Sequence, residues 1–452
     1  MPLPPHNLLL LPLILLPLTF ASPNANAMEG SETETLFSIM SSMSSDRDWR
    51  SYAPDPCSPG SSWPGIECKP GPNGRLHVTK LIFGTPPNPT CKASATFPSQ
   101  IFDLPFLQSA HFFSCFKSKK TTLFFPRSSL SSPLQQLSLR ANPSLIGAIP
   151  PQIAFLKSLQ VLTLSQNHLH GEIPESISSL SSLIHLDLSY NSLNGRIPPQ
   201  MGKMTGLIDL DLSYNSLTGL IPPSIGEMGS LQKLDLSSNS LWGSIPQSFG
   251  KLKMLTFLAL SDNRLNGFPH IGLEKLQSLQ YLIIDSNPMF TPLPPELGEL
   301  PRLQELRLAN SGYSGAIPRS FTRLRNLTTL SLGNNHLSGE IPQGLGGLSK
   351  MYHLNLSRNM LTGVVPFSDE FLRRLGRNLD LSGNPGLCLN GTGGLEGILG
   401  VGVCGKSSSS SSSDVEQPLD GSRKGASSLG DRMSYWGFGI VGFSAMYCLC
   451  LL

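Results

Sequence analysis

The chain has 452 residues, of which 14% are charged, and its formal charge at pH 7 is +3. So small a positive charge excludes a protein that binds nucleic acid through a basic surface. Hydrophobic residues make up 39% of the chain, which excludes a wholly disordered protein. Only 7% of the residues are aromatic, so we expect a core built mainly from leucine.

The N-terminal segment has the pattern of a secretory signal. An apolar run covers residues 8–20, and Ala25-Asn26-Ala27 provides the small residues of an A-x-A cleavage site. We therefore predict a signal peptide over residues 1–27. No Lys or Arg precedes the apolar run, which leaves the cleavage position open.

Export would bring the next segments into an oxidising compartment, where cysteines form disulfides. Residues 28–92 are predicted to form an N-terminal cap and the first strand, with a helix over 29–50 and the strand over 78–83. Six of the eight cysteines would face the oxidising compartment: Cys57, Cys68, Cys91, Cys115, Cys388 and Cys404.

Residues 93–387 are predicted to form repeats, because the pattern LxxLxxLxLxxNxLxGxIPxxLGxL recurs from residue 134 onward. Its period is 24 residues, with 25 at the first and last steps, and Ser311 once replaces the asparagine. This period is typical of leucine-rich repeats, so we predict an α/β solenoid with a concave parallel β-sheet and about 11–12 repeats. The recurring asparagines are Asn142, Asn167, Asn191, Asn215, Asn239, Asn263, Asn287, Asn335, Asn359 and Asn384.

Each part of the repeat has a physical reason. Strand side chains alternate between two faces, so the leucines of each LxL pair point inward and the residues between them face solvent. The asparagine that follows is expected to bond the backbone of its own loop and of the next one. Losing such a buried hydrogen bond would destabilise the fold by roughly 1–3 kcal/mol, so the asparagines are structural.

The first repeat, residues 104–115, is irregular, and Cys115 holds its asparagine position. We expect a disulfide between Cys91 and Cys115; two buried free thiols are the alternative. The basic, Ser/Pro-rich segment 117–133 then interrupts the period. A basic loop of this kind is usually only a solvated surface.

After the strand, most repeats carry Gly-x-Ile-Pro, as in Gly171-Glu172-Ile173-Pro174. Glycine permits a tight bend there, and proline prevents regular helix. This form resembles the plant-specific leucine-rich repeats of receptor kinases, receptor-like proteins and polygalacturonase inhibitors. The resemblance implies disulfide-bonded end caps, with Cys57 paired to Cys68, and Cys388 to Cys404 in a C-terminal cap over residues 388–404. Caps are needed because the end repeats expose leucine.

The concave strand face is the expected ligand surface, because its outward positions form a regular grid about 4.8 Å apart between strands. Two strips stand out on this grid. The acidic strip would attract a basic peptide or protein face, and the apolar strip resembles the anchors of protein interfaces. However, LDLS is a common spelling of this strand in the plant subfamily, so the aspartates are alternatively ordinary repeat residues. The acidic strip is His185, Asp187, Asp209, Asp211 and Asp235, and the apolar strip is Phe257, Tyr281 and Ile283.

Glycosylation sequons occur at Asn326, Asn355 and Asn390. A glycan on Asn355, which lies on the strand face, would block the C-terminal part of that face. His168 and His170 hold a metal only in principle, and a surface pair is the better reading. We expect no metal, no cofactor and no enzymatic activity, since no kinase, hydrolase or zincin motif is visible.

The C-terminal segment predicts a membrane anchor. Residues 405–434 read as a Ser-rich linker, and residues 435–452 are hydrophobic and carry no charge. Two interpretations remain open: a signal for a glycosylphosphatidylinositol (GPI) anchor, or a single transmembrane helix of marginal length. Either one would tether the repeats to the outside of the plasma membrane.

Further motifs narrow the resemblance. They are similar to the TOO MANY MOUTHS branch of plant receptor-like proteins, which implies a kinase-less co-receptor. Such a co-receptor associates with a leucine-rich-repeat receptor kinase and shapes the recognition of a secreted cysteine-rich peptide, in development or defence. The alternative is an extracellular defence protein like the polygalacturonase inhibitors. The motifs are Asp46-Arg47-Asp48-Trp49, Asn88-Pro89-Thr90-Cys91, Phe112-Phe113-Ser114-Cys115, Val364-Val365-Pro366-Phe367 and Asn384-Pro385-Gly386-Leu387-Cys388.

Overall fold

The computed structural model describes residues 28–52, 55–58, 63–126, 132–268, 272–390 and 400–405. The predicted signal peptide, most of the Ser-rich linker and the hydrophobic tail lie outside these residues. All described residues belong to one compact unit that ends at Gly405. Among them, no helix combines the length and the apolar character needed to cross a bilayer.

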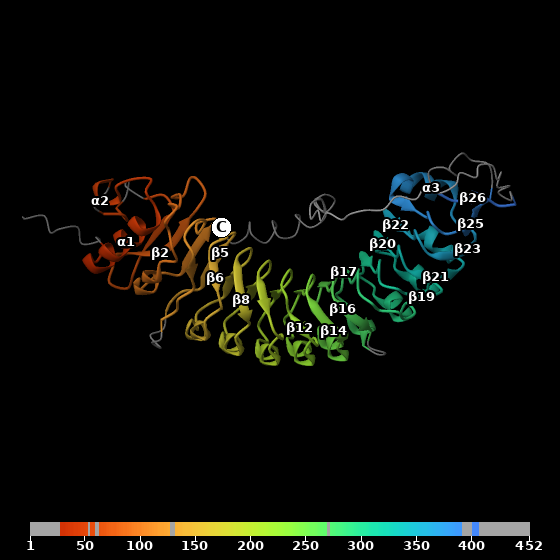
Figure 1. Cartoon of the computed structure of the whole chain (residues 1–452), viewed down its shortest axis with the longest axis horizontal. Coiled ribbons are helices and arrows are strands. Elements are labelled where there is room, and N and C mark those ends of the chain that lie inside the picture. Colours follow the sequence, from red (N-terminus) through yellow and green to blue (C-terminus); the bar gives the residue numbers. More distant parts are fainter. Residues whose placement is uncertain are drawn as a thin grey trace, which may run out of the picture. The chain divides into compact units, whose positions relative to one another are not determined.

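One continuous sheet runs through the whole unit and lies on its inner side (Figure 1). Neighbouring strands pair in parallel, except that the first two pair antiparallel. The strands in spatial order are β1 (Ile66–Pro70), β2 (Leu76–Phe83), β3 (Ser109–Phe113), β5 (Gln136–Arg140), β7 (Val161–Thr163), β9 (His185–Asp187), β11 (Asp209–Asp211), β13 (Lys233–Asp235), β15 (Phe257–Ala259), β17 (Tyr281–Ile283), β18 (Glu305–Arg307), β20 (Thr329–Ser331), β22 (His353–Asn355) and β24 (Leu379–Asp380).

The alternation of side chains follows the predicted strand pattern. In β9, β11 and β13 the central leucine is buried and both flanking residues are only half-buried. Successive leucines are paired in register, as in Leu210 beside Leu186 and Leu234. The core is therefore a stack of leucine layers, each covered by the repeats on either side.

Asparagine side chains join consecutive repeats. The Asn239 amide donates to the carbonyl of Leu236 in its own repeat and to that of Leu212 in the preceding one, at 3.1 and 3.0 Å. Its oxygen accepts the backbone N–H of Leu217, also in the preceding repeat, at 3.0 Å. The predicted bond within the asparagine's own repeat is confirmed, but the other partners lie in the preceding repeat and not in the next one as predicted. The amide reaches backward because the strand carbonyls and loop N–H groups left unpaired belong to the repeat before it.

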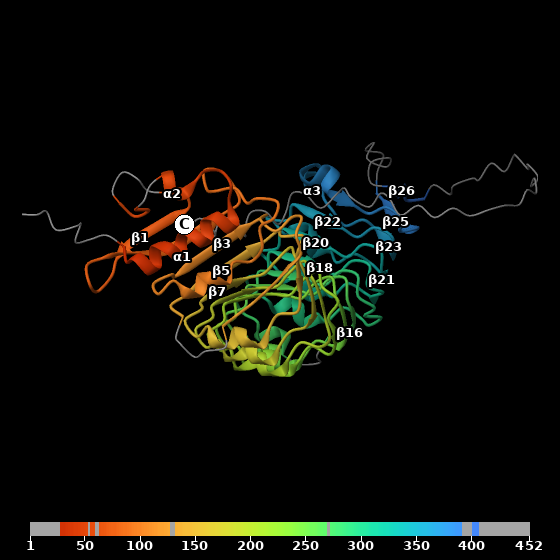
Figure 2. The same ribbon diagram turned by 60° about the vertical axis from the view of Figure 1, so that its left-hand side comes forward.

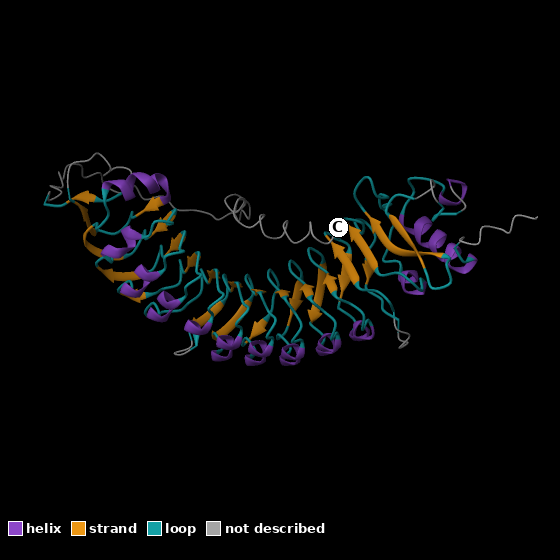
Figure 3. Ribbon diagram, turned by 180° about the vertical axis from the view of Figure 1, so that it is seen from behind, coloured by secondary structure: helices purple, strands orange, loops and turns teal. Residues whose placement is uncertain are grey.

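The convex side carries short 3₁₀ helices, each preceded in most repeats by the proline of the Gly-x-Ile-Pro segment. Figure 3 shows them on the side of the repeats opposite the inner sheet. The preceding isoleucine is buried, as Ile173 and Ile197 show. The helices are η1 (Ser99–Asp103), η2 (Pro151–Phe155), η3 (Glu175–Ser179), η4 (Pro199–Lys203), η5 (Pro223–Glu227), η6 (Gln247–Lys251), η7 (Leu273–Lys275), η8 (Pro295–Glu299), η9 (Arg319–Arg323), η10 (Gln343–Gly347) and η11 (Gly376–Asn378).

A second row of short parallel strands follows the ladder asparagines. Within the described residues this lateral row consists of three groups. Isolated bridges occur at both interruptions, Arg196 with Thr218 and Pro292 with Ser314. The first group is β4 (Thr121–Thr122), β6 (Leu145–Gly147), β8 (His168–Glu172) and β10 (Ser192–Asn194); the second is β12 (Thr218–Gly219), β14 (Ser240–Ser244) and β16 (Arg264–Gly267); the third is β19 (Ser314–Gly315), β21 (His336–Gly339), β23 (Met360–Val364), β25 (Gly386–Leu389) and β26 (Gly402–Val403).

The N-terminal cap differs from its prediction in two ways. The helix predicted over 29–50 is two helices, α1 (Gly30–Met43) and α2 (Trp49–Tyr52), and β1 was not predicted. Helix α1 ends because the backbone of Ser44 is extended, and because the next residues turn toward the segment after β2. There Asp46 accepts the Thr90 N–H at 2.6 Å. Tertiary contacts thus override the local helical pattern.

Helix α1 lies beside the first strands of the sheet (Figure 2). Aromatic packing and one buried polar pair hold it there. Trp63 is buried against Phe37 and Trp49, with ring centroids 5.3 and 5.1 Å away. On α1, Glu32 binds Nδ1 of His77 at 2.7 Å and accepts the N–H of Val78 at 2.9 Å. The cap therefore covers the first leucine layer and is fixed to β2.

Three disulfides lie at the two ends of the described unit, paired as expected. Cys57 is bonded to Cys68 on β1, and Cys91 to Cys115 after β3. Segment 117–126, expected as a loop, supplies β4 and the buried side chain of Phe125. At the other end, α3 (Asp369–Leu375) precedes the last inner strand, and Cys388 on β25 is bonded to Cys404 beside β26.

Candidate concave binding face

The outward residues of the inner strands form two columns along the concave face. In the first column Asp209 lies between His185 and Lys233, and in the second Asp211 lies between Asp187 and Asp235. The five residues of the predicted acidic strip are thus brought together over three adjacent strands. All five are half-buried, so part of each side chain is accessible to a partner.

Lys233 lies inside the acidic strip, although the sequence reasoning did not weigh it there. Its ammonium is 3.0 Å from the Asp211 carboxylate and 3.6 Å from that of Asp209. Burial opposes its charge, but these two carboxylates raise the pKa of Lys233. His185 Nδ1 lies 3.8 Å from Asp209. Four aspartates and one lysine leave the strip negative, but less so than predicted.

The second-column aspartates also stabilise their own turns. Oδ1 of Asp187 accepts the N–H and the hydroxyl of Ser189 at 2.9 and 2.6 Å, and Asp211 binds Ser213 in the same way. Asp235 accepts the Ser237 N–H at 3.0 Å. These bonds explain why the sequence Leu-Asp-Leu-Ser recurs, and they give the three aspartates a structural role. Asp209 is the one aspartate of the acidic strip that does not belong to this turn motif.

The aspartates are also close enough to influence one another. Burial, together with the Asp211 carboxylate, raises the pKa of Asp235 to about 7. The same two causes raise the pKa of Asp187. A carboxylate held this way favours a neighbouring cation, because a positive charge would relieve the repulsion within the column.

The predicted apolar strip lies on the next two strands. The rings of Phe257 and Tyr281 lie side by side with centroids 6.0 Å apart, and Ile283 is in register with Ala259. All three residues are half-buried. Beyond Tyr281 the face becomes charged again, because Arg307 and Glu305 form an ion pair on β18. The strip is therefore an apolar patch between two charged ones.

Two exposed tyrosines beside the acidic strip were missed. Tyr190 and Tyr214 stand at the turns that leave β9 and β11, each 47% exposed. Their rings are stacked with centroids 4.1 Å apart and planes 9° apart. The repeated Ser-Tyr-Asn spelling was the available signal. The predicted strips comprised strand positions alone, whereas both tyrosines lie at turns.

The predicted glycosylation sites differ in their surroundings. Asn355 lies on β22 and its oxygen accepts the N–H and hydroxyl of Ser357 at 3.0 and 2.7 Å, in the manner of the aspartates. The Asn326 amide donates to the Pro301 carbonyl at 2.8 Å. Asn390 is exposed after β25. Whether these residues carry glycans stays a prediction.

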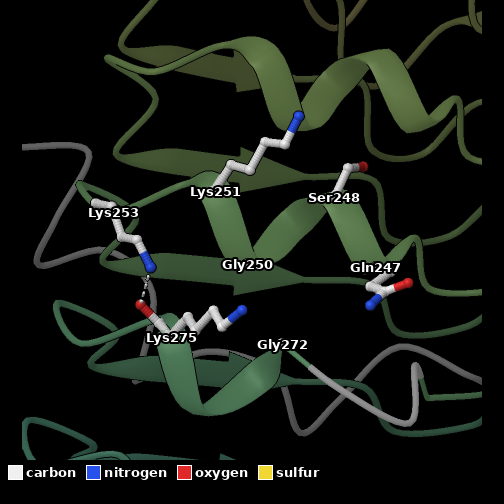
Figure 4. A pocket seen from close by; sticks show the side chains of 7 residues that line it. All are labelled: Gln247, Ser248, Gly250, Lys251, Lys253, Gly272 and Lys275. Carbon is white, nitrogen blue, oxygen red and sulfur yellow. Dashed lines mark hydrogen bonds between the residues drawn. The ribbon is translucent and has the colours of Figure 1, made fainter.

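A shallow hollow of about 460 Å³ lies on the opposite side, between η6 and η7 (Figure 4). Lys253 and Lys275 line it, and the Lys253 ammonium donates to the Lys275 carbonyl at 3.1 Å. Lys251 points away and pairs with Glu227 at 2.6 Å. His168 and His170 lie on β8, and His168 bonds the Pro143 carbonyl. Neither place has the ligands of a metal site, and the described residues contain no group of three or more His, Cys, Asp or Glu suited to one.

Comparison with known proteins agrees with this architecture. The model of the Leucine rich repeat family matches residues 132–193, 195–241, 230–289 and 301–361. A plant peptide hormone receptor, RGFR1, solved in complex with RGF2, has 30% sequence identity and a TM-score of 0.59. The match covers 69% of this chain and 47% of that receptor. The chain thus has the leucine-rich-repeat fold and is similar to plant leucine-rich-repeat receptor-like proteins.

Individual plant proteins match parts of this chain more strongly in sequence. It is similar to Receptor like protein 29 of Arabidopsis thaliana, with 61% identity over 166 residues, which is 36% of each chain. Protein TOO MANY MOUTHS of the same plant is 37% identical over 140 residues, 29% of this chain and 27% of that protein. The matched segments therefore span about a third of these relatives' own length.

Proposed function

We propose that this chain is a cell-surface co-receptor that binds a secreted cysteine-rich peptide, a leucine-rich-repeat receptor kinase, or both. The observation that carries the proposal is the adjacency of the acidic and apolar strips on the concave face. A mixed surface of this kind provides anchoring area from Phe257 and Tyr281 and orientation from the carboxylates. Binding needs no catalysis, in keeping with the non-enzymatic scaffolds of this family.

The surroundings of the chain follow from the same proposal. Residues 1–27 direct export and are removed, and the tail over residues 435–452 holds the repeats at the outer face of the plasma membrane, as a GPI signal or a transmembrane helix. A glycan on Asn355 would cover the C-terminal end of the face. The partner then binds mainly over β9 to β17, where both strips lie.

A binding measurement on the strips tests this function. Immobilised protein is exposed to a panel of receptor-kinase ectodomains, with and without secreted cysteine-rich peptides. The double variant Phe257→Ala and Tyr281→Ala should bind the strongest partner of the panel with at least about tenfold lower affinity, since central aromatic anchors dominate interface energetics. The thermal midpoint should change little, because both side chains are already half-exposed.

Tyr352→Ala is the matched control, because Tyr352 is 67% exposed and lies outside both strips. It should keep the parental affinity. No affinity for any ectodomain or peptide in the panel would refute the co-receptor function. Inhibition of a microbial pectinase in a parallel assay, without receptor binding, would instead support the polygalacturonase-inhibitor alternative.

A further inference from the structure

The non-glycine residue before each ladder asparagine, or before Ser311 in its place, forms a third column at the rim of the concave face. In ten repeats its backbone is left-handed, with φ between 52° and 59°. Such a conformation directs the side chain away from the core and is shared by unrelated residue types here. The column reads Ala141, Gln166, Tyr190, Tyr214, Ser238, Asp262, Ser286, Asn310, Asn334 and Arg358.

Two aromatic rings and one small residue make a step in this column. Tyr190 stacks on one face of Tyr214, so the other face of Tyr214 is turned toward the next repeat. That repeat carries only Ser238 at the same position. Asp262, which is exposed, follows in the repeat after it. We call Tyr214, Ser238 and Asp262 the tyrosine step.

Backbone bonds fix the spacing of the step. The N–H of Tyr214 donates to Ser237 at 2.9 Å, and the N–H of Ser238 donates to Ser261 at 2.8 Å, so the three turns lie in consecutive repeats. At about 4.8 Å per strand, Tyr214 and Asp262 are separated by about 10 Å. A serine side chain leaves room in that interval for one planar group stacked on the ring.

The charges around the step favour a cation. Burial, the stacked Tyr214, and the Asp211 and Asp235 carboxylates together raise the pKa of Tyr190 to about 12, which shows how near the acidic column lies.

Beside Asp262, the Ser261 hydroxyl is buried and has no hydrogen-bond partner among the described residues. Its counterparts Ser189 and Ser213 bind aspartates, but the matching position here is Ala259.

We propose that the tyrosine step binds an arginine side chain of the protein partner, stacked on Tyr214 and hydrogen-bonded to Asp262. This inference rests on the proposed function, since it gives the chemistry of a partner on the same face. Arginine fits better than lysine because its guanidinium is planar, stacks on aromatic rings and presents several donors to carboxylates. Asp211 and Asp235 add attraction without needing direct contact.

Fluorescent peptides of six arginines, six lysines and six citrullines test the step by anisotropy on the purified full chain. We expect the arginine peptide to bind about two- to fivefold more tightly than the lysine peptide, and the uncharged citrulline peptide to bind least. Tyr214→Asn should abolish the preference for arginine over lysine. Asparagine suits this turn, because Asn310 and Asn334 hold the same backbone conformation.

Ser238→Tyr is a second variant that keeps Tyr214 and fills the space beside it, and it should abolish the same preference. Asp262→Asn should weaken both charged peptides, and Tyr352→Ala should change neither. An arginine preference that survives both Tyr214→Asn and Ser238→Tyr, or equal binding of arginine and lysine by the parent, would overturn the proposal. Because these probes need no receptor kinase, a failure of the co-receptor function would not hide the result.

Discussion

At the scale of single residues, the same short polar side chains serve both the fold and the face. A ladder asparagine satisfies backbone groups of two repeats, and a second-column aspartate satisfies its own turn while facing solvent with the rest of its carboxylate. Asp211 is an example: Oδ1 accepts the N–H of Ser213 in its own turn, and Oδ2 accepts from the Lys233 ammonium on the concave face. Substitutions at these positions therefore separate structural from recognition roles.

Asn239→Ala should destabilise the solenoid by about 1–3 kcal/mol. The change removes the donor to Leu212 and the acceptor for the Leu217 N–H, and it leaves these backbone groups without their partner. Urea unfolding followed by circular dichroism measures the loss. Asn194→Ala is the control, because Asn194 is exposed and outside the ladder; equal destabilisation by the two variants would contradict the role given to the ladder.

Asp235→Asn should make the stability less dependent on pH. The pKa of Asp235 is about 7 in the folded chain, above its ordinary value near 4. The native state therefore binds a proton that the unfolded state has lost, and stability falls as pH rises from about 4 to 7. Asparagine keeps the turn, as Asn355 shows. It should add about 1 kcal/mol at pH 8, a modest value because solvent screens a half-buried carboxylate.

Unfolding of both proteins at several pH values between 4 and 8 provides the measurement. Asp103→Asn, at an exposed position, is the control and should leave the pH profile unchanged. A profile for Asp235→Asn that parallels the parent would show that this carboxylate is not strained by its surroundings.

At the scale of elements, attachment to neighbours decides what the chain forms. The strands, the positions of the ladder asparagines and the Gly-x-Ile-Pro bends could be predicted, because a 24-residue period imposes the same environment on each copy. The end of α1 and the antiparallel β1 could not, since both depend on contacts with residues distant in sequence. The sequence prediction left Lys233 out of the acidic strip for a similar reason. Lys233 is an ordinary repeat position in the sequence, and only the register of the strands places its ammonium between two carboxylates.

Helix α1 provides a matched test of attachment. Glu32→Ala should loosen α1 by about 1–3 kcal/mol, since buried His77 and the Val78 N–H both lose a partner. Glu34→Ala, on the same helix, removes only an exposed pair with Arg50 and should have little effect, because solvent screens exposed ion pairs. Hydrogen exchange of the α1 amides distinguishes them; similar exchange in the two variants would refute the difference in burial.

At the scale of the whole described unit, each repeat contacts its neighbours and little else, so damage at one end should stay there. The double variant Cys388→Ser and Cys404→Ser lacks the disulfide at the C-terminal end. The stability of that cap should fall by about 2–4 kcal/mol. Hydrogen exchange should rise in residues 386–390 and remain unchanged in β2 and β3. A uniform rise along the solenoid would mean that the unit unfolds as one body.

The direction of the ladder has a consequence for synthesis. Because Asn239 completes the backbone bonding of the repeat before it, a repeat leaving the ribosome lacks part of its hydrogen bonding until the next 24 residues have followed. Order should thus propagate one repeat behind elongation. Asn384 performs the last such step by accepting the Leu361 N–H, so the repeat that contains Leu361 becomes complete only when the chain has reached the residues just before its C-terminal cap.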